Sequence, residues 1–115
     1  MKTISFAEFQ NLDLRIGKVL QAERMSESRN LIRMKVDLGE KEARTILAGI
    51  AEWYPPEELA NKSFIFVANL EPKEMMGEES QGMILCADLT EKAGVDGKAV
   101  LIPVPNDLPP GTIVR

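Results

Sequence analysis

Hydrophobic and polar residues alternate along two stretches near the start of this 115-residue chain. Between residues 12 and 24, the apolar side chains that share one face are Leu12, Leu14, Ile16, Leu20 and Ala22. Between residues 31 and 38, they are Ile32, Met34, Val36 and Leu38. A period of two is typical of strands that bury one face, so we expect two strands here and a third at 43–48. Gly17 in the first stretch predicts a bulge or sharp bend, which a small closed barrel needs at its corners.

Later strands are predicted from continuous apolar runs. These runs cover 64–68, 83–89 and 99–104, and a last short strand is expected at 112–114 in a Pro-rich tail. Residues 90–98, around Gly94 and Gly97, are expected to form a turn. The pattern therefore predicts an all-β chain, organised as a single domain over 1–115.

A short helix is expected before the first strand. Ser5 and Glu8 have the spacing of a capping box, and Ile4 and Phe9 have that of a hydrophobic staple. We expect this helix to end near Gln10 and to plug one end of the core.

A second helix is expected between strands three and four. Pro56 suits the first helical position, and the glutamates after it favour the positive end of a helix. Trp53 and Tyr54 precede it, and two interpretations stay open. The rings either pack the helix over the barrel mouth or stack on nucleic-acid bases.

The chain is acidic overall, but its charge is unevenly distributed. Lys and Arg total 14, Asp and Glu total 18, and the net charge is −4. Residues 1–46 carry nine basic and seven acidic side chains, whereas 47–115 carry five basic and eleven acidic ones. RNA binders usually present a basic face. The chain therefore has either a local positive patch on an acidic body or little affinity for RNA.

Most catalytic chemistry is excluded by composition. Without histidine there is no Ser-His-Asp or Cys-His pair, and one cysteine cannot build an ordinary zinc site or an internal disulfide. We expect no catalytic residue, no metal and no cofactor. No apolar run approaches the length of about 20 residues that a membrane helix needs, so we expect a cytoplasmic protein without a membrane partner.

Seven segments carry a family resemblance. They read DLRIGKV at 13–19, TILAGIA at 45–51, YPPEEL at 54–59, NLEPK at 69–73, MMG at 75–77, ESQGM at 79–83 and LPPG at 108–111. In this order they resemble the tRNA-binding domain family. That family includes the C-terminal domain or β subunit of methionyl-tRNA synthetases and free-standing dimeric tRNA-binding proteins. Two features differ: residues 26–30 lack the family's His-Pro segment, and Glu71 and Glu74 replace commonly basic residues.

The resemblance implies an OB-fold, a small five-stranded antiparallel barrel with a C-terminal strand extension. It implies tRNA binding by shape, without reading sequence, in support of a methionyl-tRNA synthetase. It also implies a homodimer paired through 99–115, and it allows a synthetase catalytic subunit as a further partner.

Because the second and third strands of OB-folds form the binding face, the phosphate-contact candidates are Arg33, Lys35 and Arg44, with Arg15 added from the first strand. The resemblance implies that Ser80 and Met83 contact tRNA, that Asn69, Gln81 and Gly82 shape that surface, and that Lys73 adds positive charge. A structural interpretation stays open for the same segment. In it, Asn69 and Ser80 bond the loop backbone, Gly77 and Gly82 have positive φ, and Met83 lies in the core.

Charged residues on a strand also simply mark its solvated side. Two alternative functions therefore remain. The domain could be a dimerisation module with little RNA affinity, or an export-chaperone-like relative that binds unfolded peptide in its groove.

Overall fold

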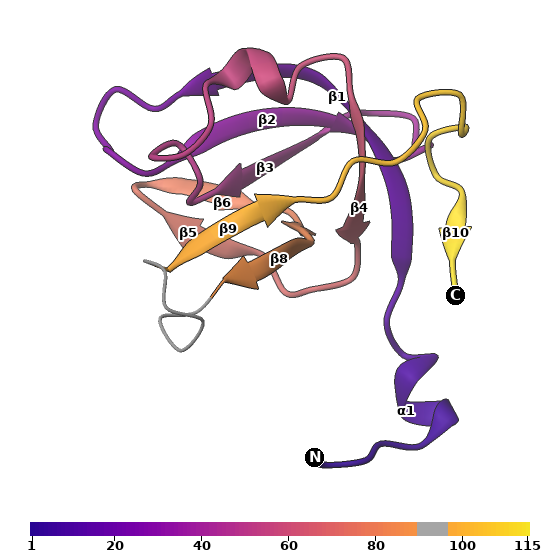
Figure 1. Cartoon of the computed structure of the whole chain (residues 1–115). Helices are drawn as coiled ribbons and strands as arrows, with labels where there is room; N and C mark the ends of the chain where they lie inside the picture. The colour runs from indigo at the N-terminus through magenta and orange to yellow at the C-terminus, as the bar shows by residue number, and fades with distance from the viewer. Residues whose placement is uncertain (90–96) are drawn as a thin grey trace.

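Antiparallel strands curl into a nearly closed barrel in the computed structural model of the chain, which describes residues 1–89 and 97–115 (Figure 1). The helical elements are α1 (Phe6–Phe9) and the 3-10 turn η1 (Pro56–Glu58). The strands are β1 (Leu14–Arg24), β2 (Ile32–Asp37), β3 (Arg44–Ala48), β4 (Ser63–Val67), β5 (Lys73–Met75), β6 (Glu78–Ser80), β7 (Met83–Ile84), β8 (Cys86–Leu89), β9 (Lys98–Leu101) and β10 (Ile113–Val114).

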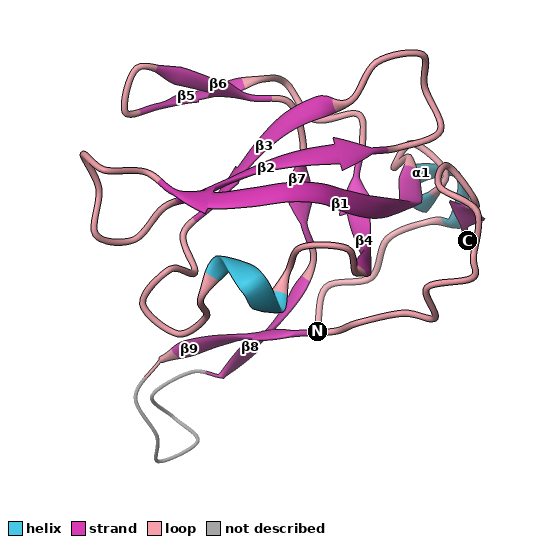
Figure 2. Ribbon diagram, turned by 90° about the horizontal axis from the view of Figure 1, so that it is seen from above, coloured by secondary structure: helices cyan, strands magenta, loops and turns pink. Residues whose placement is uncertain are grey.

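The barrel follows the strand order β3-β2-β1-β4-β7. Figure 2 shows β3, β2 and β1 side by side, with β4 crossing behind them. The two ends of this path approach each other, because the N–H of Gln81 donates to the carbonyl of Thr45 at 2.9 Å. This confirms the predicted OB-fold class.

β1 bends later than predicted. Its register with β2 shifts between Val19 and Gln21, so Val19 is fully buried while Leu20 is exposed. The prediction that Leu20 shares the buried face of Ile16 is therefore wrong, because a bulge reverses the alternation after Val19.

The core fills the inside of this sheet. The alternation predicted for β2 is confirmed, since Ile32, Met34 and Val36 are fully buried. Trp53 and Tyr54 pack against the same cluster, which confirms the packing interpretation for these rings. The hydroxyl of Tyr54 also accepts a hydrogen bond from the N–H of Leu101 at 3.3 Å.

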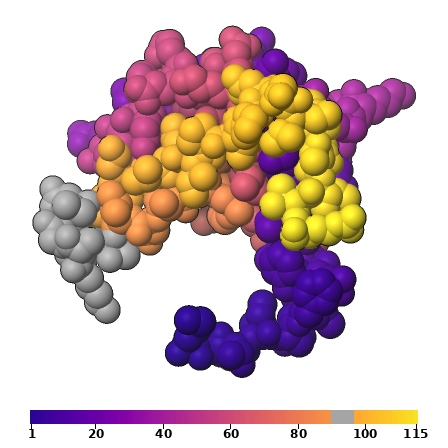
Figure 3. Space-filling view, turned by 45° about the vertical axis from the view of Figure 1, so that its right-hand side comes forward, coloured from indigo at the N-terminus to yellow at the C-terminus, as the bar shows by residue number. Residues whose placement is uncertain are grey.

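α1 stands away from the barrel. The expected capping box is present, because the Ser5 hydroxyl accepts from the Glu8 N–H and the Glu8 carboxylate accepts from the Ser5 N–H. However, no residue of the helix is buried, so the prediction that it plugs the core is wrong. The capping box needs no tertiary contact to form, and Figure 3 shows the N-terminal segment projecting from the body.

Residues 69–82 were expected to form a loop, but they contain a hairpin. β5 and β6 pair only with each other and form their own two-stranded sheet. Met76 and Gly77 both have positive φ, at 51° and 78°, as the tight turn of a two-residue hairpin requires. The exposed backbone of the expected loop is thus partly paired.

The C-terminal segment contains the two predicted strands, as β9 and β10, and it returns along the barrel of its own chain. β9 pairs with β8, Val104 bridges Ser63, and β10 pairs with the start of β1. Most of the turn expected at 90–98 lies outside the described residues. Within 1–89 and 97–115, neither helix has the length and apolar character needed to cross a membrane.

Candidate nucleic-acid interface

The cations predicted on β2 lie on the outer side of the sheet. Strand register places Gln21 and Thr45 on either side of Lys35, and it places Glu23 beside Arg33. Directly opposite residues of antiparallel strands point to the same side. We call the surface formed by Gln21, Glu23, Arg33, Lys35 and Thr45 the strand face.

Arg33 is paired with two carboxylates. Its Nε donates to Oε1 of Glu78 at 2.8 Å, its Nη2 bonds the other oxygen of Glu78, and its Nη1 bonds Glu23. The hydrogen bonds that Arg33 donates, first to Glu78 and then to Glu23, raise its pKa. Arg33 in turn lowers the pKa of Glu78. The charge of Arg33 is therefore compensated within the protein.

Lys35 carries the less compensated charge of the strand face. Its Nζ donates to Oγ1 of Thr45 at 2.8 Å, and its side chain is exposed. In the part of the chain that the structure describes, no carboxylate lies within ion-pair distance of it. An exposed ammonium on a strand face can bind a phosphate without first breaking an ion pair.

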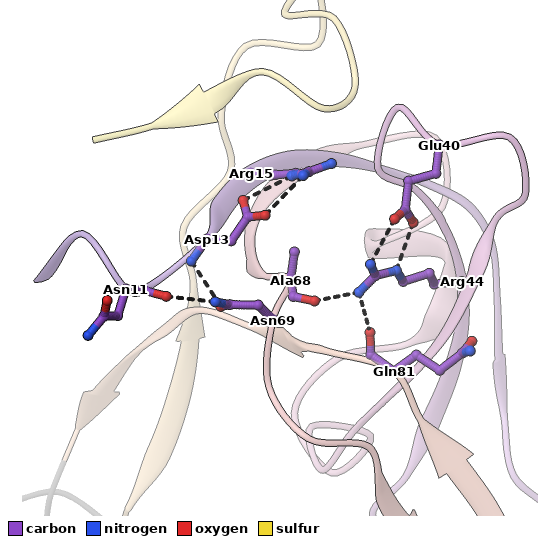
Figure 4. Close-up of polar contacts among 8 residues, drawn as sticks. All are labelled: Asn11, Asp13, Arg15, Glu40, Arg44, Ala68, Asn69 and Gln81. Atoms are coloured by element: carbon purple, nitrogen blue, oxygen red, sulfur yellow. Dashed lines mark hydrogen bonds and ion pairs between the residues drawn. The ribbon is translucent and has the colours of Figure 1, made fainter. Parts of the chain in front are cut away.

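The Arg44 side chain lies on the opposite side of the sheet from the strand face, and it links three segments of the chain. It lies opposite the buried Val36, so it does not share the side of Arg33 and Lys35. Its guanidinium bonds both oxygens of Glu40 at 2.7 and 2.8 Å and the main-chain carbonyls of Ala68 and Gln81 (Figure 4). These contacts use four hydrogen bonds of a group that has five N–H donors, which leaves little capacity for a phosphate.

Arg15 and Asn69 belong to the same end of the barrel. Arg15 forms a bidentate pair with Asp13, at 2.9 Å for both bonds, and this pairing raises its pKa. The Asn69 side chain accepts from the N–H of Asp13 at 2.9 Å and donates to the carbonyl of Asn11 (Figure 4). Asn69 thus joins the end of β4 to the segment that precedes β1.

The turn between β6 and β7 is held by side-chain to main-chain bonds. The buried Ser80 hydroxyl accepts from the N–H of Leu47 and donates to the carbonyl of Gly82, both at 3.0 Å. The Gln81 side chain accepts from the N–H of Thr45 at 3.0 Å. Gly82 has φ of 149°, and a Cβ there would lie 3.0 Å from the Val67 carbonyl oxygen.

The structural interpretation is confirmed for Ser80, which bonds the loop carbonyl of Gly82, and for the positive φ of Gly77 and Gly82. It is wrong for Asn69, whose side chain bonds the main chain of Asn11 and Asp13 and not that of the loop. The placement of Met83 in the core is wrong, because 46% of its surface is exposed. Contact of the turn with tRNA stays a prediction.

Met83 lies at a cleft that the sequence did not predict. The cleft has a volume of about 690 Å³ and lies between β3, the β5–β6 hairpin and the β7–β8 segment. Its lining is mainly apolar and consists of Leu47, Ala48, Gly49, Ile50, Leu70, Met75, Gly82, Met83, Ile84, Cys86 and Ala99, with Glu71, Lys73 and Ser80 as polar members. The methionines at 75, 76 and 83 were the available signal, since such side chains often line adaptable binding surfaces.

The structure thus divides the predicted cations. It brings Arg33 and Lys35 together on the strand face, places Arg15 and Arg44 at one end of the barrel, and puts Lys73 in the hairpin beside the cleft. Among the described residues, no three His, Cys, Asp or Glu side chains lie close enough together to hold a metal ion.

Comparison with known proteins gives consistent matches. The family model described as "Putative tRNA binding domain" matches residues 14–113. The methionine–tRNA ligase of Archaeoglobus fulgidus is 49% identical over 111 residues, which are 96% of this chain but 16% of the ligase. The corresponding ligase of Pyrococcus horikoshii is 46% identical over 106 residues, which are 92% of this chain and 14% of the ligase. The chain therefore spans only a small part of the curated relatives it matches.

Solved structures also match the chain over nearly its whole length. The MetRS-related protein from Pyrococcus horikoshii has a TM-score of 0.91 and 43% identity, and the match covers 100% of both chains. The chaperone CsaA from Bacillus anthracis has a TM-score of 0.82 and 32% identity, covering 99% of this chain and 100% of that one. Because the family model covers most of the chain and the fold agrees throughout, the chain belongs to the tRNA-binding domain family.

Proposed function

We propose that this domain binds tRNA on the strand face and at the adjoining cleft, recognising its shape and backbone charge without reading its sequence. The observation that carries the proposal is the position of Lys35, an exposed cation on β2. Arg33 lies beside it on the same strand face. OB-folds use this part of the barrel for nucleic acids, and phosphate contacts supply much of the affinity.

The cleft adds a place for an unpaired part of the RNA. Leu47 lines it and lies opposite Arg33 in the strand register, so the strand face and the cleft are neighbours. Exposed Met83 and the half-buried Met75 offer apolar surface to a base or a ribose. Lys73 can form an ion pair with a phosphate of the same RNA strand. In this proposal Ser80, Gln81 and Gly82 hold the wall of the cleft, and Asn69 and Arg44 position the segments around it.

The relatives suggest the setting. This domain would act as an auxiliary part or subunit of a methionyl-tRNA synthetase in the cytoplasm, with the synthetase catalytic subunit as a further partner. It would have no catalytic role of its own.

We also propose that two copies form a homodimer through the N-terminal helix and the C-terminal strand, which extends the interface predicted at 99–115. Phe6 in α1 and Ile113 in β10 are large apolar residues with exposed side chains, and so are Ile4 and Leu12 on either side of α1. A groove of about 420 Å³ runs between α1 and β10. A two-fold dimer would double the small positive surface of each copy.

A second candidate function is the binding of an unfolded peptide. The mainly apolar lining of the cleft and the similarity to CsaA, a chaperone, favour it. Apolar peptide side chains would bury surface there with little help from charge, so binding would depend weakly on salt.

Filter binding of bulk tRNA over a series of salt concentrations tests the main proposal. We expect binding that weakens steeply with salt. Lys35→Glu should weaken it about tenfold at low salt and should make the slope of log K against log salt shallower by at least about one. Lys41→Glu, with the same charge change in the exposed turn between β2 and β3, is the matched control. Absence of tRNA binding at low salt would reject the proposal, and Lys41→Glu weakening binding as much would show that the face is wrong.

A further inference from the structure

The β5–β6 hairpin is attached to the barrel at few points. Its two strands pair only with each other. At one end Ser80 bonds the N–H of Leu47, and Met75 packs on the small apolar cluster that includes Leu47. Gln81, directly after β6, bonds both the N–H and the carbonyl of Thr45, so this end of the hairpin is fixed to β3. Nearer the hairpin turn, the polar attachment that the structure describes is the bidentate ion pair between Glu78 and Arg33. An isolated two-stranded hairpin is only marginally stable in water, so its position depends on these attachments.

The Arg33 guanidinium is already hydrogen-bonded to carboxylate oxygens. Nε and Nη2 bond the two oxygens of Glu78, and Nη1 bonds Glu23. A carboxylate and a phosphate present the same pair of oxygens to this planar group. A phosphate therefore cannot take the bidentate position on Arg33 unless Glu78 leaves it.

We propose that Glu78 competes with RNA for Arg33, so that a backbone phosphate replaces the Glu78 carboxylate when tRNA binds. The inference rests on the proposed function of the strand face. Glu78 fits this role better than Glu23, since it lies on the separate hairpin and makes both bonds of the bidentate pair. Glu23 lies in β1 of the barrel and makes one bond.

The exchange would also change the cleft. The hairpin contributes Lys73, Met75 and Ser80 to the cleft wall. Once Glu78 leaves Arg33, the hairpin loses its attachment to the strand face and the wall can move. Occupation of the strand face and occupation of the cleft would then be coupled, and such coupling of binding free energies is reciprocal.

Glu78→Gln tests the competition, and Glu79→Gln is its control. Both remove one negative charge at adjacent positions, but Glu79 is exposed and forms no ion pair among the described residues. Glu78→Gln should therefore bind bulk tRNA about three- to tenfold more tightly than Glu79→Gln at moderate salt. Equal affinity of the two variants, or weaker binding by Glu78→Gln, would overturn the inference while leaving the proposed function intact.

Amide hydrogen exchange of the free protein gives a readout that needs no RNA. The amides of residues 73–79 should exchange faster in Glu78→Gln than in Glu79→Gln, because the hairpin loses its ion pair. Unchanged exchange would overturn the role of the pair in holding the hairpin. If no variant binds tRNA but exchange is faster, the proposed function fails, the competition with RNA fails with it, and the ion pair remains only a hairpin attachment.

Discussion

The hydroxyl of Ser80 accepts a hydrogen bond from the main-chain N–H of Leu47 at 3.0 Å and thereby ties the hairpin to β3. Ser80 is 4% exposed and Leu47 is equally buried. Water therefore cannot replace the hydroxyl if it is removed, and the Leu47 N–H would remain buried without a partner.

Ser80→Ala should lower the free energy of unfolding by about 1–3 kcal/mol, the usual effect of leaving a buried donor unpaired. Urea denaturation monitored by circular dichroism measures this change. Ser26→Ala, in an exposed part of the 25–30 loop, is the control and should change stability by less than about 0.5 kcal/mol. Equal stability of the two variants would mean that the Leu47 N–H finds another partner.

The alternation in β2 could be interpreted correctly from the sequence because each residue's side is fixed by the strand itself. Ile32, Met34 and Val36 are all fully buried, as a period of two requires. β1 could not be interpreted in this way. Its bulge at Leu20 depends on pairing with β2, and no local residue type marks that position.

The chemistry of the site was harder to predict than the fold. The sequence identified Arg33 and Lys35 as outward-facing cations, and their register agrees. Glu78, the ion-pair partner of Arg33, is 45 residues away in the sequence. No spacing rule could therefore reveal that the charge of Arg33 is compensated. Charge counting failed for the same reason: the net charge does not say which carboxylate meets which cation.

Gly17 offers a test of the packing on β1. A Cβ added there would lie 2.6 Å from Cδ1 of Phe66 and 2.8 Å from Cδ2 of Leu38, both in the core. Gly17→Ala should therefore lower the free energy of unfolding by about 1–3 kcal/mol, as overpacking does.

Gly49→Ala is the matched substitution, because a Cβ at Gly49 meets nothing within 4 Å. It should leave stability unchanged or raise it slightly by restricting the unfolded chain. Urea midpoints of the two variants measure the difference. A neutral Gly17→Ala would indicate that the Phe66 ring can move aside.

The proposed dimer predicts a change in molecular mass. Phe6 is 72% exposed on α1 and borders the groove beside β10. Phe6→Asp would place a charge in the proposed apolar interface and should convert a dimer into a monomer in sedimentation equilibrium. Met76→Asp, at a residue 56% exposed in the hairpin turn, should leave the dimer intact. A monomeric parent protein would contradict the proposal directly.

Glu40 predicts a dependence of stability on pH. The hydrogen bonds from Arg44 lower the pKa of the Glu40 carboxyl in the folded chain below its ordinary value of 4.5. Above that ordinary value, the carboxylate is charged in both states, and the pair with Arg44 contributes fully to stability. As the pH falls below 4.5, the unfolded chain binds the proton first, so the contribution decreases and is lost once the pH passes the lowered folded pKa.

The difference in unfolding free energy between the parent protein and Glu40→Gln should therefore be largest at neutral pH and should shrink on acidification. Because the Glu40 side chain is 34% exposed, solvent screening should keep this difference within about 1 kcal/mol. Urea denaturation at several pH values measures it. Glu52→Gln, at an exposed loop position, should give a smaller difference with little pH dependence. A difference for Glu40→Gln that stays constant between neutral and acidic pH would mean that the Arg44 hydrogen bonds do not depend on the carboxylate charge.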